Sequence, residues 1–254
     1  MTIRRQDKID FGIWVPVKMI IVPAVIGVVC LGLSLVYWVL LIPAGLFLFI
    51  ALYFVVARGI FASNDGIFQT RIQELLLGHI DWQGRVQVLD IGCGNGPLTI
   101  LLAKRFPQAE ITGIDYWGKN WDYSLQVCEN NARLSGVEDR TTFRSASASA
   151  LPYEDDSFDL VVSNLVFHEV RGVVDKRELL REALRVLKPG GAFVFQDLFL
   201  LRAYFGTPEE LLETIRSWGI NQVEFIPTHD QPFIPWIVKL PFMVGTMAIV
   251  RGIK

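Results

Sequence analysis

The longest apolar segment of the chain lies near its N-terminus. Residues 19–57 contain no Asp, Glu, Lys, Arg or His. One membrane-spanning helix needs about 20 predominantly apolar residues, so the segment is about twice as long as one span. Its least apolar patch, Ser34 to Trp38, falls near the middle, and Tyr and Trp favour the membrane–water interface. The pattern predicts two transmembrane helices, roughly Trp14–Val36 and Trp38–Val56, joined by a tight turn.

The charges that flank this segment predict its orientation. Arg4, Arg5 and Lys8 precede it and Arg58 follows it. Basic flanks favour the cytoplasmic side, so we expect both ends in the cytoplasm and the turn outside. A cleaved signal peptide is disfavoured because its apolar region is only about 7–15 residues long. A buried hairpin of a soluble core is disfavoured because such a long uncharged stretch is unusual there.

After residue 57 the periodicity changes, and short apolar runs alternate with helical patterns. We therefore expect a membrane anchor over residues 1–57 and a second domain over residues 58–254. The predicted strands are residues 86–90, 110–115, 141–145, 158–165, 192–196, 222–226 and 243–250. The predicted helices are residues 67–76, 98–106, 122–135, 176–187 and 208–218. This alternation predicts an α/β fold, a mostly parallel sheet with helices on both faces, whose ligands bind beyond the carboxyl ends of the strands.

Composition excludes several classes of protein. Hydrophobic residues make up 52% of the chain, which excludes disorder. Three cysteines without a CxxC pair exclude a disulfide framework. The net charge of −2 argues against a nucleic-acid partner. His79 and His229 lack neighbours at metal-ligand spacing, so we expect no metal.

The most informative motif joins the first strand of this domain to the next helix. It runs Asp90-Ile91-Gly92-Cys93-Gly94-Asn95-Gly96 and places glycine at alternate positions. Glycine lets the backbone approach a ligand closely, and the N–H groups of the following helix point toward it. A dinucleotide-binding loop would need a further glycine where Pro97 stands. Asp115 ends the next strand, where a carboxylate can accept both ribose hydroxyls; the alternative is a solvated strand-end carboxylate.

Four segments occur in an order that resembles a known family. They are Asp90–Gly96, Asp115, Leu151–Asp159 and Arg185–Gly191. Over about residues 70–200 the chain resembles class I S-adenosylmethionine-dependent methyltransferases, in particular the branch that methylates small molecules such as quinone rings and sterols.

The resemblance implies a Rossmann-like sheet of seven strands with the last one antiparallel, and S-adenosylmethionine as cofactor. It places Asp90, Gly92, Gly94 and Gly96 near the methionine moiety and Asp115 on the ribose. Tyr116 and Trp117 follow that Asp and are expected to pack on ribose or adenine; the alternative for Trp117 is packing of a lid only. Ser147 stands where relatives often carry an Asp that contacts the adenine amine, so adenine recognition departs from the family pattern there.

The segment Ser163–Glu169 begins at the end of a predicted strand and carries the candidate catalytic group. It lacks the prolines and tyrosine of amine-methylating nucleic-acid enzymes. His168 is expected near the transferred methyl, where it can take a proton from a hydroxyl, phenol or carbon acid. The alternative is a histidine that caps the following helix or is hydrogen-bonded on the side of the glycine loop. Asn164 is expected to line the cofactor pocket, unless it is a polar group of the core.

The C-terminal part suggests the acceptor. Leu198–Phe205 and Pro227–Phe242 are rich in large apolar residues, which form a substrate mouth, lie on a bilayer, or pack in the core. Together with the anchor, they favour a membrane-anchored methyltransferase of a small lipophilic acceptor, with its catalytic domain in the cytoplasm. A protein methyltransferase and a non-catalytic S-adenosylmethionine-binding membrane module remain alternatives, and the oligomeric state stays open.

Overall fold

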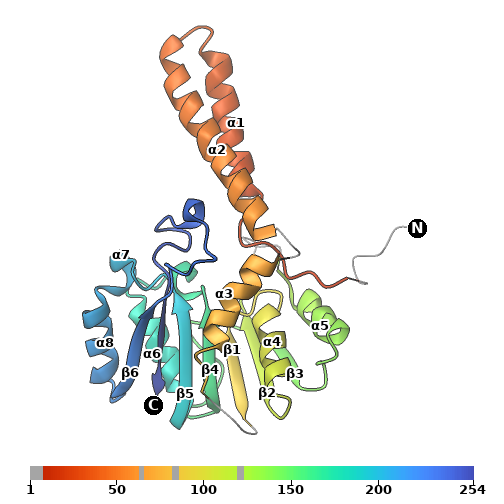
Figure 1. Cartoon of the computed structure of the whole chain (residues 1–254), viewed down its shortest axis with the longest axis vertical. Helices are drawn as coiled ribbons and strands as arrows, with labels where there is room; N and C mark the ends of the chain where they lie inside the picture. Colours follow the sequence, from red (N-terminus) through yellow and green to blue (C-terminus); the bar gives the residue numbers. More distant parts are fainter. Residues whose placement is uncertain (1–7, 63–65, 82–85, 119–122) are drawn as a thin grey trace. The chain divides into compact units, whose positions relative to one another are not determined.

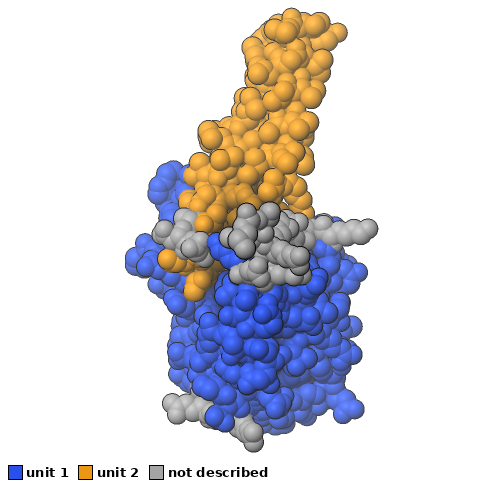
Figure 2. Space-filling model, turned by 90° about the vertical axis from the view of Figure 1, so that its right-hand side faces the viewer, with its two compact units in different colours: residues 1–11, 71–254 blue, residues 12–70 orange. Residues whose placement is uncertain are grey.

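The computed structural model describes residues 8–62, 66–81, 86–118 and 123–254. These residues form two compact units, one over residues 12–70 and one over residues 1–11 and 71–254 (Figure 2). We call them the hairpin unit and the catalytic unit. Each is described separately.

The two main helices of the hairpin unit are apolar. They carry small side chains on the inner face and large ones on the outer face, the reverse of a water-soluble core. Helix α1 (Lys18–Leu33) packs along α2 (Leu41–Ala62), with the short helix η2 (Trp38–Leu40) at the turn (Figure 1). Small residues face inward: Ala44 is buried, and a Cβ on Gly27 would lie 2.8 Å from Leu48 Cγ. Large apolar residues face outward, as at Val28 (60% exposed) and Phe49 (68% exposed). This arrangement is typical of helices packed in lipid, because lipid tails solvate the large side chains and small ones let backbones approach.

A small aromatic core closes the base of the hairpin. The ring of Phe61 lies 5.8 Å from Trp14 and 4.9 Å from Phe68. Gln69 accepts a hydrogen bond from Trp14 N at 3.0 Å, and Arg58 donates to the carbonyl oxygen of Val15. The hairpin unit therefore extends past residue 57, since its core includes the first turn of α3 (Ile67–Leu77).

The structure supports one long apolar helix rather than the two predicted spans. Within the described residues, one helical stretch, Trp38–Ala62, is long and apolar enough to cross a membrane. Helix α1 has 16 residues. At about 1.5 Å per residue it is roughly 24 Å long, short of the ~30 Å bilayer core. Helix α1 begins just after Pro16, whose carbonyl oxygen accepts from Met19 N at 3.0 Å, and it ends where the chain turns at Ser34 to Tyr37.

The catalytic unit contains a sheet of seven strands in the order β3-β2-β1-β4-β5-β7-β6. Their bounds are β1 (Gln87–Ile91), β2 (Glu110–Asp115), β3 (Thr141–Ser145), β4 (Phe158–Asn164), β5 (Leu187–Asp197), β6 (Gln222–Pro227) and β7 (Ala248–Ile253). Strand β7 is antiparallel to both neighbours and the other pairs are parallel. The predicted mostly parallel sheet is confirmed. Because β6 runs in the same direction as β5, both end at the edge where β1, β2 and β4 end.

Alternate residues of the central strands form two hydrophobic cores. Val88, Leu160 and Val162 pack under α3, α4 and α5, while Leu89 and Val161 pack under α6 and α8. Helices therefore cover both faces, as predicted (Figure 1). The bounds are α4 (Pro97–Arg105), α5 (Leu125–Leu134), η4 (Phe167–Glu169), α6 (Arg177–Arg185), α7 (Arg202–Phe205), α8 (Pro208–Ser217) and η5 (Trp236–Val238). Residue 122, the predicted start of α5, lies outside the described residues.

Two strand predictions were wrong at their starts. Strand β5 begins at Leu187 rather than 192, because Gly190 adopts a φ of 78° and its N–H bonds to Lys254, so pairing continues through the glycine pair. Strand β7 begins at Ala248 rather than 243. The preceding residues turn back on themselves, with Gly245 N donating to Leu240 O at 3.1 Å.

Candidate active site

The glycine loop is held against the ends of two neighbouring strands. Gly92, Gly94 and Gly96 have φ values of 77°, 58° and 81°, a region that side chains disfavour. Gly92 N donates to Ile114 O at 2.8 Å, and a Cβ on Gly92 would lie 2.1 Å from Val166 Cγ2. The contact joins the loop to the segment that follows β4, so glycine is required at position 92 for space as well as for conformation.

Asp115 and Trp117 fasten the end of β2 to the same loop. The Asp115 carboxylate accepts from Gly94 N at 2.9 Å and from Trp117 N at 2.8 Å. The indole N–H of Trp117 donates to Gly94 O at 2.8 Å. Trp117 is thus bonded to the glycine loop itself, whereas Tyr116 is 74% exposed. Ser147 lies just beyond β3, whose last residue, Ser145, pairs with Asp115.

Asp90 lies beneath the loop and is fully buried. Its carboxylate accepts a hydrogen bond from Thr99 Oγ1 at 2.6 Å, which ties the end of β1 to α4. Burial raises the pKa of Asp90 to about 7; the Thr99 hydrogen bond opposes the rise and the nearby Asp115 carboxylate adds to it.

An asparagine network that sequence reasoning missed supports the far side of the loop. The Asn131 amide donates to Asn95 O and to Asp10 O, both at 2.9 Å, and Asn95 Nδ2 donates to Asp10 O at 3.0 Å. Both asparagines are buried. Neither residue forms a motif, so only its partners in the fold reveal this role.

The segment after β4 carries a histidine–aspartate pair. His168 Nδ1 lies 2.6 Å from Asp197 Oδ1. Asp197 is fully buried at the end of β5, and its carboxylate also accepts from the N–H groups of Val166, Phe167 and Leu198. An ionised carboxylate only accepts, so His168 donates through Nδ1 and keeps the Nε2 lone pair available. The sequence signal for Asp197 was its place directly after an apolar strand, the same signal that identified Asp115.

The environment of His168 raises its pKa. Burial of the ring opposes protonation, but the carboxylates of Asp197 and Glu169 outweigh it, so the pKa lies above the usual value near 6.5. The side chain retains 18% exposure. The pair can therefore accept a proton from a bound molecule.

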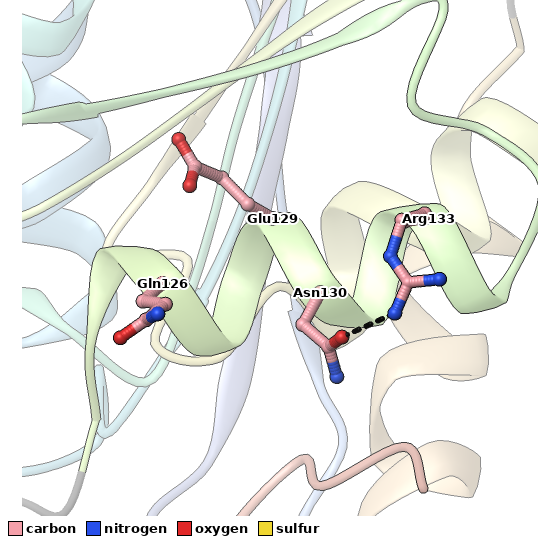
Figure 3. A pocket seen from close by; sticks show the side chains of 4 residues that line it. All are labelled: Gln126, Glu129, Asn130 and Arg133. Carbon is pink, nitrogen blue, oxygen red and sulfur yellow. Dashed lines mark hydrogen bonds between the residues drawn. The ribbon is translucent and has the colours of Figure 1, made fainter. Parts of the chain in front are cut away.

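The groups at this edge fit a ligand with hydrogen-bond donors. The Asn164 Oδ1 atom, at the end of β4, is buried and has no partner within the described residues. A charged amino group would satisfy it, and Asp115 retains lone pairs for hydroxyls. A separate shallow depression of about 310 Å³ is lined by polar side chains of one helix, and it includes none of these residues (Figure 3): Gln126, Glu129, Asn130 and Arg133.

Comparison with known proteins identifies the domain. Residues 83–229 match the family model described as "Methyltransferase domain". The chain belongs to this methyltransferase family. The match confirms the predicted class I methyltransferase domain, with S-adenosylmethionine as its cofactor.

The names of curated relatives of this methyltransferase describe enzymes that act on small molecules. It is 33% identical over 157 residues to a 27-O-demethylrifamycin SV methyltransferase of Amycolatopsis mediterranei, covering 62% of this chain and 54% of that protein. It is 32% identical over 127 residues to a ubiquinone/menaquinone biosynthesis C-methyltransferase of Geotalea daltonii, covering 50% and 48%. The chain thus spans about half the length of these relatives.

Solved structures share the fold. A geranyl diphosphate C-methyltransferase from Streptomyces coelicolor, solved with S-adenosyl-L-homocysteine, superposes with a TM-score of 0.58 at 15% identity, covering 75% of this chain and 78% of that one. The [4+2]-cyclase SpnF superposes with a TM-score of 0.57 at 22% identity, covering 76% and 84%. The fold therefore does not by itself fix the reaction.

The geometry of the glycine loop predicts that Gly92→Ala strongly lowers both stability and cofactor binding. The substitution adds the left-handed penalty of about 1–2 kcal/mol and the overlap with Val166. We expect lower unfolding free energy and S-adenosylmethionine binding weakened at least tenfold, measured by urea titration and calorimetry in detergent. Gly136→Ala is the matched control, since its φ is 66° but nothing lies within 4 Å. Equal effects of the two variants would contradict the contact.

Asp90 predicts a pH dependence of stability. Because its pKa is about 7 in the folded chain and about 4 when unfolded, the folded state binds the proton more tightly. The stabilisation is complete below the unfolded pKa and is lost as pH rises through the folded pKa. Between pH 5 and 8 the unfolding free energy should fall relative to Asp90→Asn, by on the order of a few kcal/mol. Parallel pH profiles for the two proteins would show that Asp90 does not titrate this way.

Proposed function

We propose that the protein is a membrane-anchored methyltransferase that methylates a small lipophilic acceptor at an oxygen or acidic carbon. The observation that carries this proposal is the His168–Asp197 pair, whose segment packs on the glycine loop through Val166. A general base is needed where the acceptor must lose a proton, and the hydrogen bond from His168 Nδ1 to Asp197 supports assigning this role to His168.

The chain's own residues supply positioning and proton transfer. S-adenosylmethionine, when bound, supplies an electrophilic methyl group on a positively charged sulfur. The glycine loop, Asp115 and Asn164 would hold it. His168 Nε2 would take the acceptor's proton, and Asp197 would stabilise the resulting imidazolium. Alignment and exclusion of water supply most of the remaining rate gain.

A lipophilic acceptor agrees with two independent features. The named relatives methylate a rifamycin and a quinone precursor. The hairpin unit exposes large apolar side chains around small inward ones, as lipid-embedded helices do. An anchor raises the effective concentration of the enzyme near a membrane-dissolved substrate.

The hairpin is proposed to insert from the cytoplasmic side with both ends on that side. Basic residues flank it and its interior carries no charge. Helix α2 is long enough to cross, whereas α1 reaches roughly 24 Å, so the turn lies near the far boundary of the hydrocarbon. Tyr37 and Trp38 at this turn suit an interface.

The function is tested by following labelled methyl in membrane extracts. Label from S-adenosylmethionine should enter the organic phase. His168→Gln should lower this rate about 10²–10⁴-fold without changing cofactor affinity by calorimetry. The native rate should rise with pH through the raised pKa of His168, because only the neutral ring accepts a proton. Asp197→Asn should move that limb to lower pH. Label in protein, or no label with intact cofactor binding, would favour the protein-methylating or the non-catalytic alternative.

Membrane insertion predicts a sharp effect of Val28→Asp. Val28 is 60% exposed, so a charge there would be tolerated in water but costs about 2.5–3.5 kcal/mol at the centre of a lipid-embedded helix. We expect the variant to leave the carbonate-resistant membrane fraction, while Val28→Leu stays in it. Retention of the aspartate variant would contradict insertion.

A further inference from the structure

The connection between β6 and β7 presents aromatic side chains on a rigid frame. We call residues 228–247 the β6–β7 strap. Its anchors Val238 and Met247 are fully buried, yet Trp236 is 81% exposed and Phe242 is 58% exposed. Turns within the strap hold this shape, as where Thr246 Oγ1 donates to Pro241 O at 2.7 Å. The buried anchors and the hydrogen-bonded turns therefore hold the rings of Trp236 and Phe242 in exposed positions.

The strap lies at the same edge of the sheet as the methyl-transfer site. Strand β6 runs parallel to β5, so the strap leaves the sheet where β5 delivers Asp197 (Figure 1). Two backbone hydrogen bonds fix it there, from Thr228 N to Met247 O at 3.1 Å and from Leu200 N to Thr246 O at 3.0 Å.

Exposed apolar residues lie at this edge, together with the strap's Lys239–Asp230 ion pair. Val174 (98% exposed) follows β4, and Tyr204 (40% exposed) follows β5. At the opposite edge the described residues form ion pairs: Arg185 with Asp155, Lys188 with Asp159, and Lys254 with Asp156. The edge that holds the candidate site thus also displays exposed apolar side chains.

The charge of the strap and its position along the chain both favour a lipid surface as its binding partner. Lys239 pairs with Asp230 at 3.1 Å, which leaves the strap without net charge from these two residues to attract an ionic partner. The chain passes from the hairpin unit into the catalytic unit at residue 71. The guanidinium of Arg71 lies 5.8 Å from the Phe233 ring of the strap. The strap therefore adjoins the point where the chain arrives from its anchor, and Trp favours a membrane interface.

We propose that the β6–β7 strap is a second membrane contact, which seats the edge of the catalytic unit that carries the active site on the lipid surface. It rests on the proposed membrane anchoring. Trp236 and Phe242 insert at headgroup depth, so an apolar acceptor reaches His168 from the bilayer without crossing water.

The test uses the full chain in vesicles of phosphatidylcholine and phosphatidylglycerol. An environment-sensitive nitrobenzoxadiazole label is attached at Trp236→Cys or Phe242→Cys, in a Cys30→Ser background that leaves only buried native thiols. We expect a blue-shifted emission that spin-labelled lipid quenches at least twofold. A label at Leu134→Cys, at the end of α5 and 36% exposed, is the matched control and should stay unquenched.

A label on native Cys30 separates this inference from the anchoring itself. Quenching at Cys30 without quenching at position 236 or 242 would overturn the strap contact alone and favour a protein partner for it. A label at Cys30 that emits as in water and is not quenched by spin-labelled lipid would overturn the anchoring on which the strap contact rests. Methyl transfer is measured separately, so neither result depends on it.

Discussion

One buried carboxylate sets the geometry of the candidate site. Asp197 accepts hydrogen bonds from three backbone N–H groups and from the His168 ring. The same bonds hold Val166 where it meets Gly92, so one group positions both the proposed base and the glycine loop. A fully buried charge is tolerated only when such donors surround it. The positions of His168 and Val166 therefore depend on strand β5 ending next to strand β4.

The two units solve opposite packing problems. In the catalytic unit large apolar side chains point inward between sheet and helices, because burial from water is favourable for them. In the hairpin unit the large side chains point outward and the small ones inward. Such an inversion is typical of helices surrounded by lipid, which agrees with the proposed membrane anchoring.

Much of the fold follows from local pattern. Strands β2 and β3 have the predicted bounds, because β-branched and aromatic residues between turn residues define them. The site is less predictable where it depends on pairs that are distant in sequence. His168 and Asp197 meet only through the order of β4 and β5, and Asn95 and Asn131 carry no motif. Helix α1 is shorter than hydropathy indicated because Pro16 and the turn after Leu33 limit it, and hydropathy does not register either.

The asparagine network gives the N-terminal segment a thermodynamic part in cofactor binding. Asp10 bonds through its backbone to Asn95 in the glycine loop and to Asn131 behind it. Any ligand that orders the loop also favours the docked form of this segment, and by linkage the docked segment tightens ligand binding by the same factor. Residue 10 lies two residues before the start of the hairpin unit in the chain. With the proposed anchor, tension transmitted along the polypeptide would therefore change the affinity of the enzyme for its methyl donor.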